Sequence, residues 1–578
     1  MKHNKLSLIG GLLAAISVNA LVAPPSSSTR LQQRHRSGNV VKTVAPPGIA
    51  HNWIGQQPSS RFFHSDCTSR ESNVALYSSS ASTSDATITT SSQETEAPAS
   101  ITMMIGIASA FVGYFYCTCI KMGVKLLWRQ FPNSNLSKAI PASRHILCMM
   151  TLGGALVASL STVFFPTLFS AHDYVHILSN ESDEEGTNKM SKFPGIKCML
   201  PLLGLSMLTS ISGFSLGPEA PMVGAGSLVG VNLGRKYIKS KKERGDGAVI
   251  DDDAKLEETF AYAGAAGALT GALNFPLAGP IFALECTSRH IGLTRAAGKN
   301  WGNSMLASLA GMAIIRGLLF PSSHVGGHFT YSASAAVGML HGREMVLAGL
   351  GMGVCGAVVG TCFHKGVTFL KNAIWSKNDK SSSKAVVIGK KVLIAALIGY
   401  ISTLFPQTMF WGEPSMQCMV DGQCTPFSAT PHGLPTAMMQ AARVNPNQPF
   451  ASGSAALQVG LAKFSAIALA TAAKFPGGVI FPLLSNGAAF GHALVSALGP
   501  ILPAASSSLV PPLMIMSFMG ALLTSITRTP LASVLILAFT ASGMTPLSVL
   551  LPGALMASYV SVWVSERLSK DSFFSYSE

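Results

Sequence analysis

A stretch of 91 residues near the carboxyl end of the chain contains a single charged side chain. From Phe475 to Ser565, Arg528 is the only Asp, Glu, Lys or Arg. A bilayer-spanning helix needs about 20 apolar residues, so this stretch is long enough for several such helices. Of the 578 residues, 48% are hydrophobic and 12% are charged, whereas a typical soluble protein has about 25% charged residues. These features exclude a soluble enzyme and predict a membrane protein that crosses the bilayer several times.

Segments of spanning length without Asp, Glu, Lys or Arg recur from Ile101 onward. They are 101–120, 145–172, 259–284, 317–342 and 392–412. Gly and Pro interrupt several of these segments, which is tolerated in membrane helices because neighbouring elements satisfy the freed backbone groups. We therefore predict an all-α polytopic fold in which many helices are short, tilted or half-spanning.

The net charge of +15 does not indicate nucleic-acid binding, because there is no long basic run. The lysines lie between apolar segments, as in loops on the side from which a membrane protein is inserted. Seven of them fall between His364 and Lys391. The ten Cys form no CxxC pair and lie at no ligand spacing from His, so we expect no metal and no cofactor. Cys418 and Cys424 share one predicted loop, either as a disulfide or as two free thiols.

The first 100 residues differ from the rest of the chain. Residues 1–20 have the basic start, apolar run and small-residue end of a signal peptide. Residues 21–77 form a transit-like presequence, since Met1 to Ser65 contains seven Lys or Arg and no acid. Residues 78–100 are a Ser- and Thr-rich disordered linker.

This order resembles the bipartite presequences of algae with secondary plastids, in which a junction such as ALVAP (20–24) follows the signal peptide. The resemblance implies a plastid membrane, thylakoid or envelope. The alternative is a plain secretory signal with a disordered tail, which implies an endomembrane location.

Two Gly- and Pro-rich segments match each other across the chain. GPEAPMVGAGSLVG (217–230) and GGVIFPLLSNGAAFG (477–491) share the pattern Pro-x4-Gly-x3-Gly after a Gly-rich turn. A second pair follows, GALTGALNFPLA (267–278) and GALLTSITRTPLA (520–532). The equivalent prolines lie 261 residues apart in the first pair and 254 in the second. We infer an internal duplication, with repeat halves at about 101–320 and 343–570 of a membrane domain spanning 101–570.

Interrupted segments at corresponding places in two halves are typical of a transporter's central site. A helix that begins inside the membrane directs free N–H groups and the positive end of its dipole towards the midplane. Two such helix starts that converge can hold an anion without a buried cation. Gly226, Gly230, Gly487 and Gly491 would let the helices pack closely.

These motifs resemble the CLC family of chloride channels and anion–proton exchangers. GFSLGPEAP (213–221) is similar to the family's Gly-x-Glu-Gly-Pro segment, and PGGVIFP (476–482) to its Gly-x-Phe-x-Pro segment. AGALTGALNFPLAGPIFALE (266–285) and ITRTPLASVLILAF (526–539) match two further helices. The resemblance implies an inverted-repeat fold of up to 18 membrane helices that transports anions and is not an enzyme. It also implies a homodimer with one anion pathway per subunit.

The resemblance assigns a role to each matching residue. Glu219 is the gating glutamate, whose carboxylate competes with the anion and leaves when it is protonated. From Pro194 to Gly234, Glu219 and Lys197 are the only charged residues. An acid inside the membrane is by default a functional candidate. The alternative role is a helix N-terminal cap. The main-chain anion site comprises Val479, Ile480, Phe481 and Ala220, and the supporting turns are formed by Gly217, Pro221, Gly477, Gly478 and Pro482.

Several positions depart from the family pattern. Cys286 stands where exchangers carry the inner proton-relay glutamate, and a thiol with a reference pKa of about 8.5 is a poor relay near neutral pH. This favours a channel gated by voltage or pH, moving chloride or another small anion; the alternative is a proton-coupled exchanger that uses Glu285. Glu285 could instead pair with Arg289.

Two more departures concern the anion pathway. Ser179 has roughly the spacing of the missing Gly-Ser-Gly-Ile-Pro serine, so chloride-against-nitrate preference stays open. Phe574 replaces a pore tyrosine, with Tyr576 nearby. Since the sequence ends at Glu578, we expect no carboxyl-terminal nucleotide-binding domains.

Overall fold

The computed structural model divides the chain into two units, Met1–Gln93 and Glu94–Glu578. The described residues all belong to the second unit. They are 97–133, 140–179, 193–244, 250–287, 295–319, 342–375, 383–421, 434–445, 450, 452–499, 511–541, 547–569 and 573. The predicted signal peptide, the presequence and nearly all of the linker therefore lie outside them, and the first described helix begins at Ala99.

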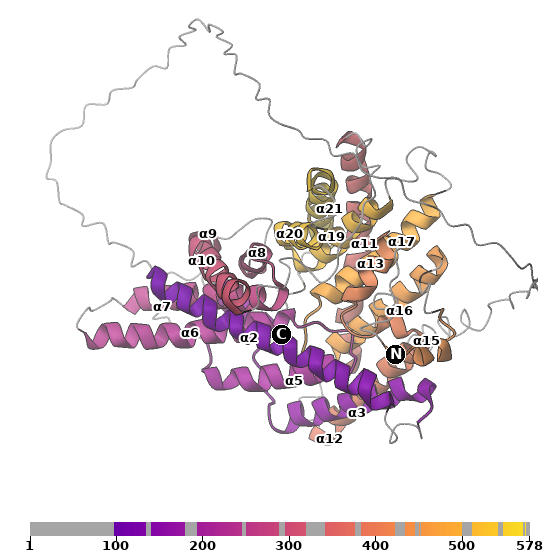
Figure 1. Ribbon diagram of the computed structural model, residues 1–578, viewed down its shortest axis with the longest axis horizontal. Coiled ribbons are helices and arrows are strands. Elements are labelled where there is room, and N and C mark those ends of the chain that lie inside the picture. The colour runs from indigo at the N-terminus through magenta and orange to yellow at the C-terminus, as the bar shows by residue number, and fades with distance from the viewer. Residues whose placement is uncertain are drawn as a thin grey trace, which may run out of the picture. The chain divides into compact units, whose positions relative to one another are not determined.

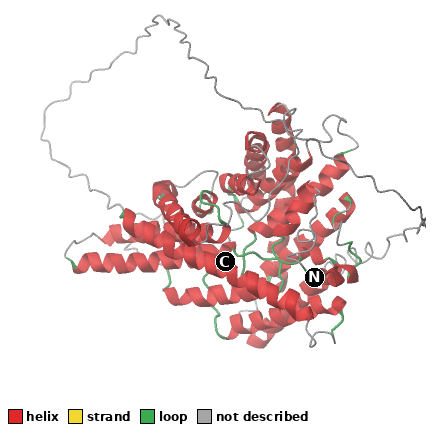
Figure 2. Ribbon diagram, viewed as in Figure 1, coloured by secondary structure: helices red, strands yellow, loops and turns green. Residues whose placement is uncertain are grey.

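Helices joined by loops and turns make up the described ranges, which contain one isolated β-bridge and no strand (Figures 1 and 2). The helices of the first half are α2 (Ala99–Lys125), α3 (Ala142–Val163), α4 (Ala171–Ser179), α5 (Met199–Ile211), α6 (Glu219–Glu243), α7 (Ile250–Leu273), α8 (Ala278–Glu285), α9 (Arg295–Lys299) and α10 (Trp301–Met312). Those of the second half are α11 (Gly342–Ile374), α12 (Lys384–Leu404), α13 (Glu413–Asp421), α15 (Thr436–Ala441), α16 (Gly453–Ala472), α17 (Ile480–Leu498), α19 (Pro511–Thr527), α20 (Pro530–Ala541) and α21 (Leu547–Leu568).

Six described helices are long and apolar enough to cross a bilayer. They are Ala99–Gln130, Arg144–Val163, Arg343–Ile374, Lys384–Leu404, Gly453–Ala472 and Ile480–Leu498. Shorter apolar helices accompany them, such as Pro511–Thr527 and Pro530–Ala541, as the interrupted segments predicted. The predicted segment 259–284 does not form one continuous helix. Residues Asn274–Leu277 are not helical and separate α7 from α8. Most of 317–342 lies outside the described residues.

The two halves repeat the same helix packing. In the first half α2, α6, α7 and α10 pack together, and in the second half α11, α17, α19 and α21 do so (indigo to magenta, and orange to yellow, in Figure 1). Among the helix pairs that join the halves are α3 with α12 and α8 with α20. Each of these two pairs combines equivalent helices, which is the arrangement expected about a pseudo-two-fold axis. The structure therefore agrees with the duplication inferred from the sequence.

Matching backbone conformations extend this equivalence to single residues. Gly213 and Lys474, which lie 261 residues apart, both have left-handed φ, at 93° and 59°. Asn274 and Arg528, 254 residues apart, have φ of 62° and 57°. The same local turn thus precedes each pair of equivalent helices.

Two tryptophans cap equivalent helix ends. The Trp128 indole Nε1 donates to the Ile211 carbonyl at the end of α5 at 2.7 Å, and the Trp375 Nε1 donates to the Ala472 carbonyl at the end of α16 at 2.8 Å. Carbonyls at a helix end lack partners within their own helix, so each indole satisfies one of them inside the apolar core. The turns that follow α5 and α16 are held in equivalent positions as a result.

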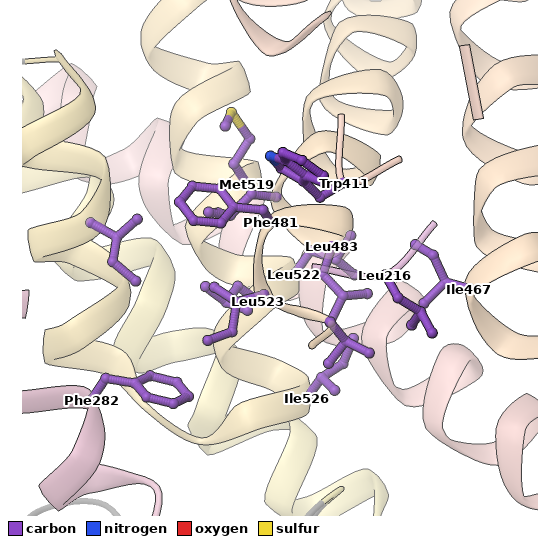
Figure 3. Packing of buried hydrophobic residues seen from close by; sticks show 14 of the residues in the cluster. Leu216, Phe282, Trp411, Ile467, Phe481, Leu483, Met519, Leu522, Leu523 and Ile526 are labelled. Atoms are coloured by element: carbon purple, nitrogen blue, oxygen red, sulfur yellow. The ribbon is translucent and has the colours of Figure 1, made fainter. Parts of the chain in front are cut away.

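Small residues bring the helix backbones into contact. A Cβ added at Gly226 would collide with the Gly264 carbonyl, and one at Gly230 would collide with the Phe260 carbonyl. In the second half, a Cβ at Gly487 would lie 2.8 Å from the Met519 Cα. Leu483 on α17 and Leu522 and Ile526 on α19 fill the core beside this contact (Figure 3). The predicted close packing of α6 on α7, and of α17 on α19, is confirmed.

Candidate functional site

The starts of α6 and α17 are tied together by backbone hydrogen bonds. Gly217 N–H donates to the Gly478 carbonyl at 2.7 Å, and Gly478 N–H donates to the Gly217 carbonyl at 2.6 Å. This pair is an antiparallel bridge between residues 261 positions apart. The Phe214 and Phe475 rings, also equivalent, pack 4.7 Å apart next to it. The bridge therefore joins the two halves where both helices begin.

Glu219 is the first residue of α6 and is fully buried. Its Oε1 accepts a hydrogen bond from the Phe481 N–H at 3.2 Å. A Cβ added at Gly217 or at Gly478 would collide with the Glu219 carboxylate. The carboxylate therefore fills the space that these two glycines leave at the start of α17. The second carboxylate oxygen, Oε2, has no hydrogen-bond partner among the described residues.

Val479, Ile480 and Phe481 of the predicted main-chain site lie at the same place. Val479 precedes α17, Ile480 is its first residue and Phe481 its second. The first N–H groups of a helix have no partner within that helix, and they carry its positive dipole end. The structure thus brings the predicted residues Glu219, Gly478 and Phe481 into contact. On the α6 side, Pro218 precedes the helix and has no N–H to offer.

A second buried acid binds another helix start. Glu285, the last residue of α8, accepts from the Leu531 N–H at 3.1 Å through Oε1 and from the Ala532 N–H at 2.8 Å through Oε2. Both donors lie in the first turn of α20, so this carboxylate caps that helix. Arg289, the partner considered from sequence, lies outside the described residues. The neighbouring Cys286 is buried, and its thiol lies 3.4 Å from the Ala283 carbonyl.

The start of α4 carries a capping box that sequence analysis missed. Ser170 N and Oγ both donate to Asp173 Oδ2 at 2.7 Å, and Asp173 N donates to Ser170 Oγ at 3.3 Å. A Ser-x-x-Asp spacing before a helix is the signal that could have located this start. Ser179, the serine considered from sequence, is the last residue of α4. A helix carboxyl end exposes carbonyl oxygens, which disfavour an anion.

A cavity opens beside the start of α6. It is lined by Cys117, Ile120, Lys121, Pro218, Ala272, Leu273, Phe275, Trp411, Glu413 and Phe481. Phe481, whose N–H holds Glu219, lies beside Trp411 in the close view (Figure 3). The Trp411 Nε1 donates to Glu413 Oε2 at 3.0 Å and orients that carboxylate. Lys121 and Glu413 were not identified from sequence, because no motif marks either residue.

Two remaining sequence predictions concern the position of the pore tyrosine and the pair Cys418 and Cys424. Phe574 and Tyr576 lie outside the described residues, whereas the Phe573 ring packs 6.2 Å from that of Phe363. Cys418 is disulfide-bonded, and Cys424 lies outside the described residues.

Comparison with known proteins identifies the family. The model of the voltage gated chloride channel family matches residues 185–566. The chain belongs to this family. A curated relative, the voltage-gated ClC-type chloride channel ClcB of Salmonella typhimurium, is 25% identical over 375 residues, which cover 64% of this chain and 73% of that protein.

Solved structures show the same fold. A slow cyanobacterial Cl⁻/H⁺ antiporter matches with a TM-score of 0.60 at 17% identity, covering 83% of this chain and 97% of its own. A CLC-type fluoride/proton antiporter has a TM-score of 0.55 at 15% identity, over 82% and 96% of the two chains. A eukaryotic CLC transporter has a TM-score of 0.55 at 14% identity, over 82% and 72%. The predicted all-α inverted-repeat fold is confirmed, and the protein is a multi-pass membrane protein that transports anions.

Proposed function

We propose that this protein is a passive chloride channel in which Glu219 is the gate. The observation that carries the proposal is the position of the Glu219 carboxylate, which is bound by the Phe481 N–H at the start of α17. A carboxylate is itself an anion, so it occupies the kind of site that a mobile anion would use. Among the described residues no Lys or Arg forms a salt bridge with the Glu219 carboxylate, and the Phe481 N–H donates a hydrogen bond to it.

In this mechanism the protonation state of Glu219 opens and closes the pathway. An ionised carboxylate is held at the N–H groups of α17, and it excludes the transported anion. A protonated, neutral carboxyl group interacts much more weakly with a helix dipole, so an anion can displace it. The main-chain N–H groups of Val479, Ile480, Phe481 and Ala220 then bind that anion. The channel therefore opens more readily at low pH, or when voltage drives the anion into the site.

The inner side of the fold favours a channel over an exchanger. Cys286 occupies the position at which the family's exchangers carry a proton-relay glutamate, and a buried thiol exchanges few protons near neutral pH. Glu285, the neighbouring acid, is held by two N–H groups of α20. Such a carboxylate is engaged in capping a helix and is less available to carry protons. The name of the curated relative, a chloride channel, points the same way.

Proton-coupled exchange is the second candidate function. It is favoured by the titles of two structural neighbours, a Cl⁻/H⁺ antiporter and a fluoride/proton antiporter. A flux assay in liposomes separates the two functions by recording chloride and proton movement together under a chloride gradient. A channel carries chloride without stoichiometric protons, whereas an exchanger drives protons uphill.

Two further parts of the proposal concern assembly and location. We propose a homodimer with one pathway per subunit, which chemical cross-linking in membranes would test.

We also propose that the protein resides in a plastid membrane, on the basis of its presequence. Imaging of the full chain fused to a fluorescent protein would test that location against an endomembrane.

A further inference from the structure

The cavity beside the gate offers the space into which Glu219 can move. When its side chain leaves the Phe481 N–H, it needs room next to the start of α6. The cavity meets this need, because Pro218 and Phe481 form part of its wall. Phe275 and Trp411 supply apolar wall to the same cavity. An apolar wall accepts a neutral carboxyl group far more readily than an ionised one.

The charge of Glu413 at the wall of this cavity opposes an ionised Glu219. Glu413, the first residue of α13, is held towards the cavity by the Trp411 Nε1 at 3.0 Å. It lines the same cavity as Pro218, the residue that precedes Glu219. Two carboxylates that face one small cavity repel each other strongly where the surroundings are of low dielectric. Lys121 on α2 lines the same cavity and has the opposite sign.

We propose that Glu413 is a gating residue that makes the release of Glu219 depend on a proton. The negative charge of Glu413 raises the free energy of an ionised Glu219 in the cavity, whereas a protonated Glu219 enters it without this cost. Glu219 therefore stays bound at α17 at alkaline pH and leaves it at acidic pH. This inference rests on the proposed gate, and it adds the residue that sets the pH response of that gate.

The other charged or titratable groups around Glu413 do not supply the same effect. They are Cys117 and Lys121 on α2, Lys463 on α16 and His492 on α17. The Lys463 ammonium donates to the Thr408 and Phe410 carbonyls, so it fixes the loop that carries Trp411. The His492 Nδ1 lies 2.9 Å from the Met419 carbonyl, near the other end of α13.

The test is the pH dependence of chloride flux through Glu413→Gln in liposomes. Removing the charge should raise chloride flux at alkaline pH by about tenfold. This is the change in a protonation equilibrium that corresponds to one pKa unit. Flux at acidic pH should change little, so the pH profile flattens. Glu413→Asp keeps the charge and should keep the profile. Glu344→Gln, which removes an exposed acid at the start of α11 outside the cavity, is the matched control and should leave the profile unchanged.

Measurements in a Glu219→Gln background separate this inference from the proposed function. There, Glu413→Gln should have no further effect on the pH profile, because the titrating gate is absent. If Glu219→Gln alone leaves the pH response intact, the proposed gate is wrong and this inference goes with it. If Glu219→Gln removes the response but Glu413→Gln preserves it, only the role of Glu413 is wrong.

Two further outcomes are decisive. An equal rise in flux at every pH, present also in the Glu219→Gln background, would mean that Glu413 only repels permeating anions, and would overturn the inference.

If Glu413→Gln fails to fold, the salt dependence of chloride flux through the unmodified protein tests the inference instead. An impermeant salt such as potassium gluconate weakens repulsion between charges in a solvent-connected cavity. It should raise alkaline flux selectively, and a uniform or absent response would overturn the inference.

Discussion

The Phe481 N–H donates a hydrogen bond to Glu219, a residue 262 positions earlier in the chain. This bond places the acid that begins α6 at the amino end of α17, its equivalent in the second half. The duplication therefore does more than build two similar bundles. It sets two helix starts against each other through the Gly217–Gly478 bridge, and a carboxylate from one half accepts a hydrogen bond from a backbone N–H of the other.

Glu219→Gln should keep chloride flux and lose its pH dependence. Gln has nearly the same shape but no charge, so it resembles the protonated gate and cannot be titrated. The ratio of flux at pH 5 to flux at pH 8 should fall to about one, since a group that does not titrate contributes no pH dependence. Chloride efflux from liposomes at a series of pH values measures this ratio. An unchanged ratio in folded protein would show that Glu219 is not the gate.

Gly478→Ala should displace the Glu219 carboxylate from its position. The new Cβ would collide with that carboxylate and would lie 2.9 Å from the Ala220 N and 3.0 Å from the Glu219 N. Overpacking of this kind typically costs about 1–3 kcal/mol. We expect a lower unfolding temperature together with weaker pH gating, because the closed position of the gate becomes strained.

The matched control for this change is Gly204→Ala on α5. A Cβ at Gly204 meets no atom within 4 Å and Ala favours the helix more than Gly does, so gating should stay unchanged and the unfolding temperature should not fall. Combining Gly478→Ala with Glu219→Ala should recover part of the lost stability, since the colliding carboxylate is gone. Equal losses with and without Glu219 would mean that the strain lies in the bridge alone.

Ile480 separates main-chain binding from side-chain binding. It is the first residue of α17, a position at which Pro is tolerated because its N–H has no partner in the helix. Ile480→Ala retains the N–H and should retain chloride affinity. Ile480→Pro removes the donor and should weaken binding by about 0.5–1.5 kcal/mol or more, the usual contribution of one hydrogen bond.

Calorimetric titration of detergent-solubilised protein with chloride measures both affinities. Val479 has ψ of −2°, a value that a following Pro disfavours, so thermal unfolding of the Pro variant must be recorded beside it. Equal chloride affinity in the two folded variants would argue against coordination by this N–H.

Local patterns in the sequence were enough to predict the fold and to single out Glu219 as the candidate gate. The glycines and prolines of the two repeats occur at fixed spacing, because a helix start inside the membrane needs particular backbone conformations at neighbouring residues. The offset of 261 residues therefore predicted two equivalent interrupted segments, and in the structure Glu219 and Ile480 begin the helices of these segments. The resemblance to a known family then supplied their roles.

Contacts between distant residues were beyond the reach of that reasoning. Glu285 is bound by Leu531 and Ala532, which lie 246 and 247 residues away, so sequence analysis considered only its near neighbour Arg289. Glu413 and Lys121 come together in one cavity through the packing of separate helices. No spacing rule connects such residues, because their proximity depends on how whole helices pack.

The unmodified protein should move chloride without stoichiometric protons, and the reason lies at Cys286. An exchanger must pass protons from the inner solution to Glu219 through a group that gains and loses them near neutral pH. The Cys286 thiol is buried, and thiols have a reference pKa of about 8.5, so it stays protonated and passes few protons. Simultaneous recording of chloride and pH in liposomes under a chloride gradient measures the coupling.

Cys286→Glu should introduce some proton coupling only if the rest of the proton path is intact, which the replacement of the pore tyrosine by Phe574 opposes. Cys286→Gln is similar in size and does not titrate, so it should introduce none. Glu285 is the acid that could act instead, although two N–H groups of α20 hold its carboxylate. If the unmodified protein drives protons uphill along a chloride gradient, the channel proposal is wrong. If Glu285→Gln then loses that proton movement but keeps chloride flux, Glu285 is the relay. A carboxylate that only caps α20 would affect stability and not the number of protons moved.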